Sequence, residues 1–204
     1  MDGHIDAGKL NQPLKVLELR ETGSGVWEWV PLRTAWAQVE QTAKTNLFSK
    51  VGVGARDAAV VIRRQSLTLH NALRWGERHL FLTAITQRGR GHLDVSAALV
   101  AVVRCRAQRT QETVGQAGRP VPNQVLDLTF PAVLTEKYAR HEPQETYAQV
   151  ESCFVLVTPK VIALKAGDLV TVQEGPAQAE YQVKAPHILD EWKNEYEIVW
   201  RRDV

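Results

Sequence analysis

The sequence contains little cysteine, no long apolar run and almost no net charge, and each shortage excludes a class of protein. Two cysteines among 204 residues, Cys105 and Cys153, cannot build a disulfide framework, which favours an intracellular origin. The longest apolar run, Ala97–Val103, is much shorter than the ~20 residues that a membrane-spanning helix needs, so we expect no membrane partner. The formal net charge of +2 does not predict a protein that coats nucleic acid. Residues 1–10 lack an apolar core, so we expect no secretory signal there.

Motifs that carry chemistry are also missing. None of the six histidines stands at metal-binding spacing from another histidine or a cysteine. The glycine-containing stretch Val51–Asp57 ("VGVGARD") has neither the third glycine of a dinucleotide-binding loop nor the Gly-Lys-Ser/Thr of a P-loop. The nearest acid–base group, His187–Glu191 ("HILDE"), is more typical of a solvated or capping role. We therefore expect no catalytic residue, no metal and no cofactor.

Alternation of apolar and polar residues dominates the chain and predicts β-strands. Gly23-Ser24-Gly25 between two alternating runs predicts a β-hairpin. One long strand is expected over His92–Cys105, and one or two helical turns over Ser66–Gly76. Further strands are expected at Leu14–Arg20, Val26–Val30, Thr34–Glu40, Ala58–Arg64, Leu80–Thr86, Val125–Phe130, Thr146–Ser152, Phe154–Thr158, Asp168–Val172, Glu180–Ala185 and Glu195–Arg202.

Two copies of one small domain are predicted. Trp36–Glu40 ("WAQVE") and Tyr147–Glu151 ("YAQVE") share four residues, and similar strand patterns follow each of them. Residues 107–124 are polar, contain glycines and prolines and have no apolar period, which predicts a linker. The expected fold is all-β, with two small tandem β-barrel or sandwich-like domains over 1–106 and 125–204 and at most short helices.

Residues 41–57 follow "WAQVE" in the first half, whereas only Ser152 and Cys153 separate "YAQVE" from the next predicted strand. We interpret 41–57 as an insertion in one copy. Long connections without a period are usually functional or mobile. Two interpretations remain open, a surface loop that packs one phenylalanine into the core, or a projecting loop that contacts another chain. The residues expected to make that contact are Leu47, Phe48, Val51, Gly52 and Gly54.

Several stretches together resemble the head–tail adaptor proteins of tailed bacteriophages, also called head-closure or head-tail joining proteins. In the first half these are "DAGKLNQPLKVLE" (Asp6–Glu18), "WAQVE" and "VVIRRQSLTLHNALRWGERHLFLTAI" (Val60–Ile85). The second half is similar to the C-terminal part of longer adaptor-like proteins from prophages of Gram-positive bacteria. It carries "LTFPAVLTEKY" (Leu128–Tyr138), "LKAGDLVTV" (Leu164–Val172) and "ILDEWKNEYEIVWRRDV" (Ile188–Val204).

The resemblance implies a structural virion protein rather than an enzyme, built as a small β-barrel that forms a ring of six or twelve copies. Such a ring lies at the phage neck, joins the portal or adaptor ring to tail proteins, and helps to close the DNA channel. The protein would lie in the virion neck, and in the host cytoplasm during assembly, with only incidental contact with packaged DNA. In the family the loop between the second and third strands reaches into the channel and can plug it, and by position this loop is 41–57.

Other functions also fit the residues. A tail-completion or minor tail structural protein would have the same make and other partners. A nucleic-acid-binding β-barrel would use arginines for phosphate contacts and predicts a continuous basic face with salt-dependent affinity. The arginines in question are Arg63, Arg64, Arg88, Arg90, Arg104, Arg106, Arg201 and Arg202. Core packing explains most of the six tryptophans, and one or two of them could be interface anchors.

Overall fold

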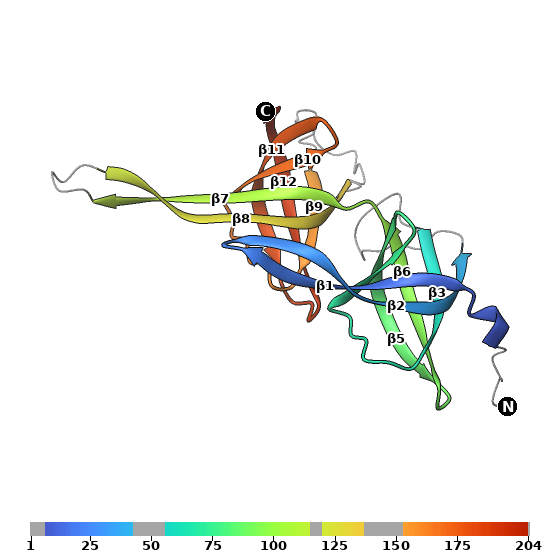
Figure 1. Ribbon diagram of the computed structural model, residues 1–204. Coiled ribbons are helices and arrows are strands. Elements are labelled where there is room, and N and C mark those ends of the chain that lie inside the picture. The colour runs from blue at the N-terminus through green and yellow to red at the C-terminus, as the bar shows by residue number, and fades with distance from the viewer. Residues whose placement is uncertain (1–6, 43–55, 115–119, 137–152, 204) are drawn as a thin grey trace, which may run out of the picture. The chain divides into compact units, whose positions relative to one another are not determined.

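The computed structural model describes residues 7–42, 56–114, 120–136 and 153–203, most of which form β-strands (Figure 1). A 3-10 turn, η1 (Ala7–Lys9), precedes the first strand. The strands of the first half are β1 (Gln12–Gly23), β2 (Val26–Thr42), β3 (Arg56–Arg63), β4 (Asn71–Trp75), β5 (Arg78–Arg88) and β6 (His92–Val100). Those of the second half are β7 (Val103–Val114), β8 (Pro120–Glu136), β9 (Cys153–Pro159), β10 (Leu169–Glu174), β11 (Ala177–His187) and β12 (Lys193–Asp203). The predicted all-β fold is confirmed.

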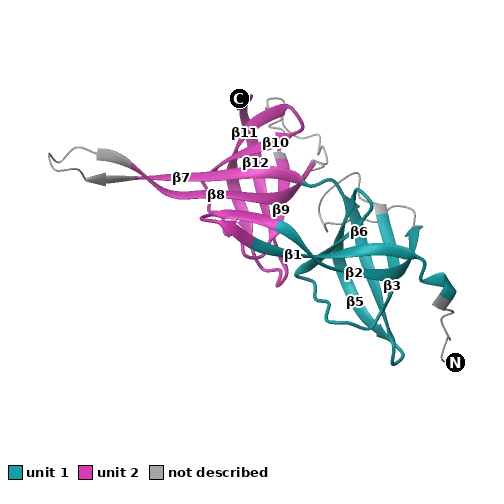
Figure 2. Ribbon diagram, viewed as in Figure 1, with its two compact units in different colours: residues 1–20, 29–102 teal, residues 21–28, 103–204 magenta. Residues whose placement is uncertain are grey.

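The chain divides into two compact units (Figure 2). Unit 1 consists of residues 1–20 and 29–102, and unit 2 of residues 21–28 and 103–204. In unit 1 the strand order is β1-β4-β5-β6-β3-β2, and the pairing of β1 with β2 closes the ring. In unit 2 the order is β7-β10-β11-β12-β9-β8, and the pairing of β7 with β8 closes it. Each unit is therefore a closed six-stranded barrel, and β7 to β12 repeat the order of β1 to β6, which confirms the tandem barrels.

Equivalent strand pairs give the residue correspondence between the two barrels. Val39 of β2 pairs with Val60 of β3, and Leu134 of β8 pairs with Leu156 of β9. Counting back equal distances from Val39 and Leu134 matches buried residues of β2 with buried residues of β8. The matched pairs are Ala37 with Ala132 and Ala35 with Phe130. Two buried positions of β2 thus correspond to two buried positions of β8.

The sequence match that suggested the repeat is not the structural correspondence. Trp36–Glu40 lies in β2, and its counterpart β8 ends at Glu136, whereas Tyr147–Glu151 lies outside the described residues. The prediction of an insertion in one copy only is also wrong. Residues 43–55 separate β2 from β3, and residues 137–152 separate β8 from β9, so both copies carry a long connection at the same place. Four identical residues in an alternating pattern recur by chance, because alternation is common to all the strands.

The predicted linker is mostly strand, because residues 107–124 fall largely in β7 and β8. Much of that hairpin projects beyond its barrel, so it has no apolar period to read. The units divide after Val102, and the strand predicted over His92–Cys105 breaks at residues 101–102. The helical turns predicted over Ser66–Gly76 are also wrong, since Asn71–Trp75 forms β4 between β1 and β5.

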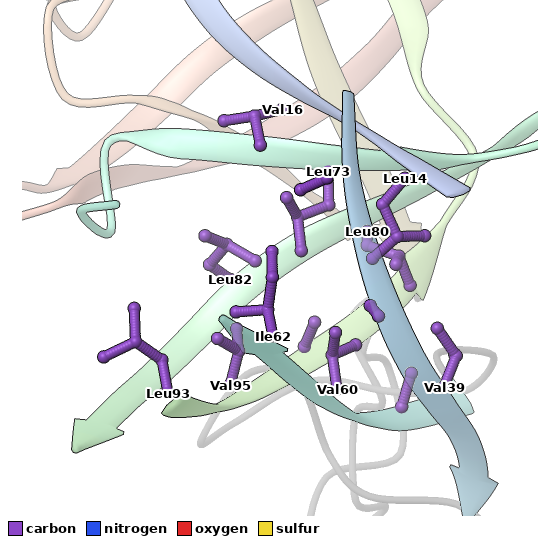
Figure 3. Close-up of a cluster of buried hydrophobic side chains, with 14 residues drawn as sticks. Leu14, Val16, Val39, Val60, Ile62, Leu73, Leu80, Leu82, Leu93 and Val95 are labelled. Atoms are coloured by element: carbon purple, nitrogen blue, oxygen red, sulfur yellow. The ribbon is translucent and has the colours of Figure 1, made fainter. Parts of the chain in front are cut away.

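The core of unit 1 lies inside its barrel, where alternate residues of the strands point inward (Figure 3). Leu14, Leu73 and Leu80 are fully buried there. Burying one such side chain stabilises the fold by about 1.5–3 kcal/mol, so this cluster is the main source of stability of the barrel. Ile62 and Val60 of β3 complete its centre.

The core of unit 2 is built in the same way, with Phe130, Leu156 and Ile198 fully buried. Cys105 of β7 belongs to this cluster. Burial raises the pKa of the Cys105 thiol to about 12, so the group is protonated at neutral pH and acts as a small packing residue.

In both barrels the connection after the third strand packs two apolar residues against the core. These are Leu67 and Leu69 in unit 1, and Ile162 and Leu164 in unit 2. In unit 2 the Tyr196 hydroxyl holds this connection, because it donates to the Ile162 carbonyl at 2.8 Å and accepts from the Leu164 N–H at 3.0 Å. Two apolar residues follow the third strand of each barrel and pack on its core, and this shared feature supports the repeat independently of strand order.

His79 of β5 is expected to make the stability of unit 1 depend on pH. Its ring lies 5.5 Å from that of Trp29, and burial, with a smaller contribution from Arg74, lowers the pKa of His79 from 6.5 to about 4. The unfolded chain therefore binds the proton more tightly, so stability is fully present above pH 6.5 and is lost as pH falls toward 4. We expect this loss to reach at most about 3 kcal/mol and to be absent from His79→Gln. Urea unfolding of both proteins at several pH values measures it, and parallel profiles would contradict the prediction.

Candidate assembly surface

Each barrel extends its first hairpin beyond the strands that flank it. β1 pairs with β4 only through Lys15–Glu18, and β7 pairs with β10 only through Arg104–Gln108. The hairpin partners β2 and β8 pair with the next strand of their own barrel only from Ala37 and Val133 onward. We call the two projecting parts arm 1 and arm 2. Arm 1 is Leu19–Val30, and arm 2 is residues 109–114 together with residues 120–126.

The tip of arm 1, residues 21–28, belongs to unit 2. The Thr129 N–H of β8 donates to the Gly25 carbonyl at 2.7 Å, and Val26 pairs with Thr129 in parallel. Trp27 packs against the hydrophobic cluster of unit 2. The tip thus occupies the edge of β8 in the stretch that β9 does not cover.

Gly25 is needed at this contact. Its φ of 71° lies in the left-handed region, and a Cβ added there would lie 2.5 Å from the Asp127 carbonyl oxygen. The close approach of the two backbones therefore depends on the absence of a side chain. The sequence shows this glycine only as turn chemistry, because its neighbour in β8 is about a hundred residues away.

Within the described ranges, arm 2 pairs with no strand beyond its own two. The ladder between β7 and β8 continues to Val114 opposite Pro120, with a register shift between Arg109 and Thr110. Figure 1 shows this hairpin extending well beyond the other strands of unit 2. A two-stranded ribbon leaves unpaired backbone groups along both edges, which are available to another chain.

The root of arm 2 is fixed by an ion pair whose carboxylate is buried. Arg109, the first residue beyond the pairing with β10, donates through Nε and Nη2 to both carboxylate oxygens of Asp168, each at 2.6 Å. Asp168 is only 2% exposed, and its Oδ2 also accepts from the Lys165 N–H at 2.8 Å. The hydrogen bonds to Asp168 raise the pKa of Arg109. This bidentate contact sets the position at which the ribbon leaves the barrel.

Four of the arginines considered for phosphate binding have carboxylate partners. Arg106 donates two hydrogen bonds to Asp127, and these lower the pKa of Asp127. Arg88 pairs with Asp94 at 3.2 Å, and Arg201 and Arg202 both lie within reach of Glu180. These pairs reduce the positive charge that the surface offers to nucleic acid.

The acid–base stretch "HILDE" forms a turn rather than a site. The Oδ1 atom of Asp190 accepts from the backbone N–H groups of Trp192 and Lys193, at 2.8 and 3.2 Å, which is the capping role expected for it. Nε2 of His187 lies 3.2 Å from Glu197 Oε1 across the β11–β12 pair. In the part of the chain that the structure describes, no group of three His, Cys, Asp or Glu residues could hold a metal.

The five residues predicted to contact a partner lie outside the described residues, between Thr42 of β2 and Arg56 of β3. They are Leu47, Phe48, Val51, Gly52 and Gly54. Sequence reasoning missed both arms, although the polar stretch 107–124 coincides with most of arm 2. No helix in the described ranges is long and apolar enough to cross a membrane.

Comparison with protein-family models, with curated proteins and with solved structures gave no match. We therefore argue what the chain can bind from its own surfaces. Among these surfaces, the projecting ribbon of arm 2 is the one that the stability of its own barrel explains least.

Proposed function

We propose that this protein is a structural assembly protein that acts by binding other protein chains. The observation that carries the proposal is arm 2, a ribbon with open backbone edges whose root is fixed by the pair between Arg109 and Asp168. A hairpin that only closed a barrel would not need a projecting part anchored by a bidentate ion pair. The barrel interiors support the same conclusion, because residues such as Phe130 and Tyr196 fill them with packed side chains.

Within this class, the protein is a ring-forming component of a bacteriophage neck that joins the portal or adaptor ring to tail proteins. The support is the resemblance of the stretches Asp6–Glu18, Val60–Ile85 and Ile188–Val204 to head–tail adaptor proteins, and the barrel fold agrees with that resemblance. A tail-completion protein of similar make is the nearest alternative, and it differs in which ring it contacts.

The test is mixing the purified protein with portal rings and, separately, with tail-tube protein from the same genome, followed by light scattering coupled to size exclusion. We expect a complex with portal rings in a fixed, ring-like ratio. Binding to the tail tube alone would favour the tail-completion alternative. Free duplex DNA is the control, and binding to DNA that weakens steeply with salt would replace the proposal by a nucleic-acid-binding function.

A further inference from the structure

The turn between β11 and β12 presents apolar side chains to solvent. Leu189 is fully exposed, and its neighbour Ile188 is half exposed. Val161, which follows β9, is also half exposed, and Nζ of the adjacent Lys160 donates to the Ile188 carbonyl at 2.7 Å, so the two segments are neighbours. Isolated exposed apolar residues are common, whereas an exposed apolar group of this kind is typical of a binding surface.

Polar contacts fix the backbone that carries Leu189. Lys160 Nζ also donates to the Asp190 carbonyl at 2.5 Å. On the other side of the turn, Asp190 Oδ1 accepts from the Trp192 N–H at 2.8 Å. An apolar side chain on an ordered backbone loses little conformational entropy when it binds, which suits an interface anchor. We call residues 188–191 the knob.

A groove with an apolar lining lies beside β2 of unit 1. It has a volume of about 490 Å³, and Leu10, Ala35 and Trp36 are among the residues that line it. β3 pairs with β2 only from Ala37 onward, so this part of β2 has no partner on that side. Trp36 is 57% exposed, and tryptophan is enriched among the residues that dominate binding energy. We call this place the groove.

The knob and the groove carry opposite charges. Arg63 and Arg64 line the groove, both are exposed, and neither forms an ion pair with any residue in the described ranges. No carboxylate lines the groove. The knob ends in Asp190 and Glu191, which are also exposed. Each surface thus combines an apolar part with charge of one sign, and the two signs are complementary.

We propose that the knob of one molecule binds the groove of a second copy of this chain. In this contact Leu189 packs beside Trp36, and Glu191 lies toward Arg63 and Arg64. A second copy is the occupant because the chain itself supplies, on one ordered turn, both the apolar anchor and the acidic groups that match the groove.

The proposed contact joins two different surfaces, so it is heterologous, and each molecule can bind one neighbour through its knob and another through its groove. Such contacts generate rings where the rotation closes and open filaments where it does not. One turn in one groove is a small contact, so we expect a single contact to be weak. The inference deepens the proposed function and rests on its claim that the chain acts by binding protein chains.

Two variants remove the two halves of the contact. Leu189→Asp places a charge at the apolar end of the knob, and Trp36→Glu places one in the groove. The matched controls introduce the same residue types elsewhere. They are Val125→Asp, at an exposed valine of arm 2, and Trp200→Glu, at the other tryptophan that is about half exposed. Circular dichroism and urea unfolding confirm that each variant is folded.

Sedimentation velocity over a range of concentrations up to millimolar is the measurement. Wild type and both controls are expected to self-associate, and either variant alone to weaken association at least about 30-fold. In an equimolar mixture of the two variants, the intact knob of Trp36→Glu can bind the intact groove of Leu189→Asp. That mixture is therefore expected to give a dimer and nothing larger.

The electrostatic part of the contact has its own test. Glu191→Arg is expected to weaken association about fivefold, and high salt to weaken association of wild type, because the charges involved are exposed and screened. Glu174→Arg, in the turn between β10 and β11, makes the same change in net charge and is the control. Equal effects of the two substitutions would overturn the charge match between knob and groove.

Several results would overturn the inference. They are a wild type that is monomeric throughout, a knob or groove variant that associates like wild type, a mixture that stays monomeric, and a loss in Val125→Asp as large as that in Leu189→Asp. A monomeric wild type whose binding to portal rings is lost in Trp36→Glu would assign the groove to a portal segment instead. Failure to bind portal rings with self-association intact would overturn the neck assignment alone.

Discussion

Asp168→Ala is expected to lower the free energy of unfolding by about 2 kcal/mol, because it removes a carboxylate that is only 2% exposed and leaves the partly exposed Arg109 without its partner. The carboxylate accepts three hydrogen bonds, two from Arg109 and one from the Lys165 N–H. Removing it therefore takes away the hydrogen-bond acceptor of both the root of arm 2 and the turn before β10. Urea unfolding followed by circular dichroism measures the loss.

A matched pair between β7 and β8 provides the control. Arg106 and Asp127 form the same bidentate contact, but both side chains are more than 40% exposed. Asp127→Ala is expected to change stability much less, because water and salt screen an exposed pair. The double variant Arg109→Leu with Asp168→Leu is expected to recover most of the lost stability, since it leaves no buried charge. Equal losses at Asp168 and Asp127 would show that burial of the pair is unimportant.

Gly25→Ala is expected to detach the tip of arm 1 from β8. The new Cβ would lie 2.5 Å from the Asp127 carbonyl oxygen, so one of the two backbones must shift. The measurement is hydrogen exchange of the Thr129 amide, which donates to the Gly25 carbonyl. We expect its exchange to become at least about tenfold faster, which corresponds to about 1.4 kcal/mol of lost protection.

Gly89→Ala is the control that separates backbone strain at positive φ from the steric clash with β8. Gly89 also has a positive φ, 58°, but a Cβ there would meet nothing within 4 Å. Both substitutions introduce the backbone strain of an alanine at positive φ, which costs about 1–2 kcal/mol, and only Gly25→Ala adds the clash with β8. The Thr129 amide is expected to exchange in Gly89→Ala as it does in wild type. Unchanged exchange in Gly25→Ala would mean that the tip contact survives a shifted backbone.

The sequence predicts the strands well where one face is buried. The strand predicted at Ala58–Arg64 is β3, and its inward residues Val60 and Ile62 are in the core. Prediction fails where a hairpin leaves its barrel, because the stretch 107–124 has no apolar alternation and β10 flanks it only as far as Gln108. The interruption between β6 and β7 at residues 101–102 also cannot be seen in the sequence, because apolar residues continue across it.

The candidate surface was predictable only in part. Trp36 is 57% exposed, and the expectation that one or two of the six tryptophans anchor an interface stays a prediction. The role of Gly25 depends on contact between distant strands, which a local pattern does not encode. Asp168 was assigned to a strand, and its contact with Arg109 spans 59 residues of sequence.

Unit 2 takes residues 21–28 from the start of the chain, which affects the order of events during synthesis. The ribosome completes arm 1 roughly a hundred residues before β8 emerges, an interval of about 5–20 s at ordinary elongation rates. During that interval the tip of arm 1 has no edge in its own chain to bind, and a neighbouring chain that is folding at the same time can offer the edge of its β8. Strong overexpression should therefore yield dimers in which two chains exchange arm 1. The number of such dimers then depends on the order in which arm 1 and β8 are synthesised, and not on the stability of the folded protein.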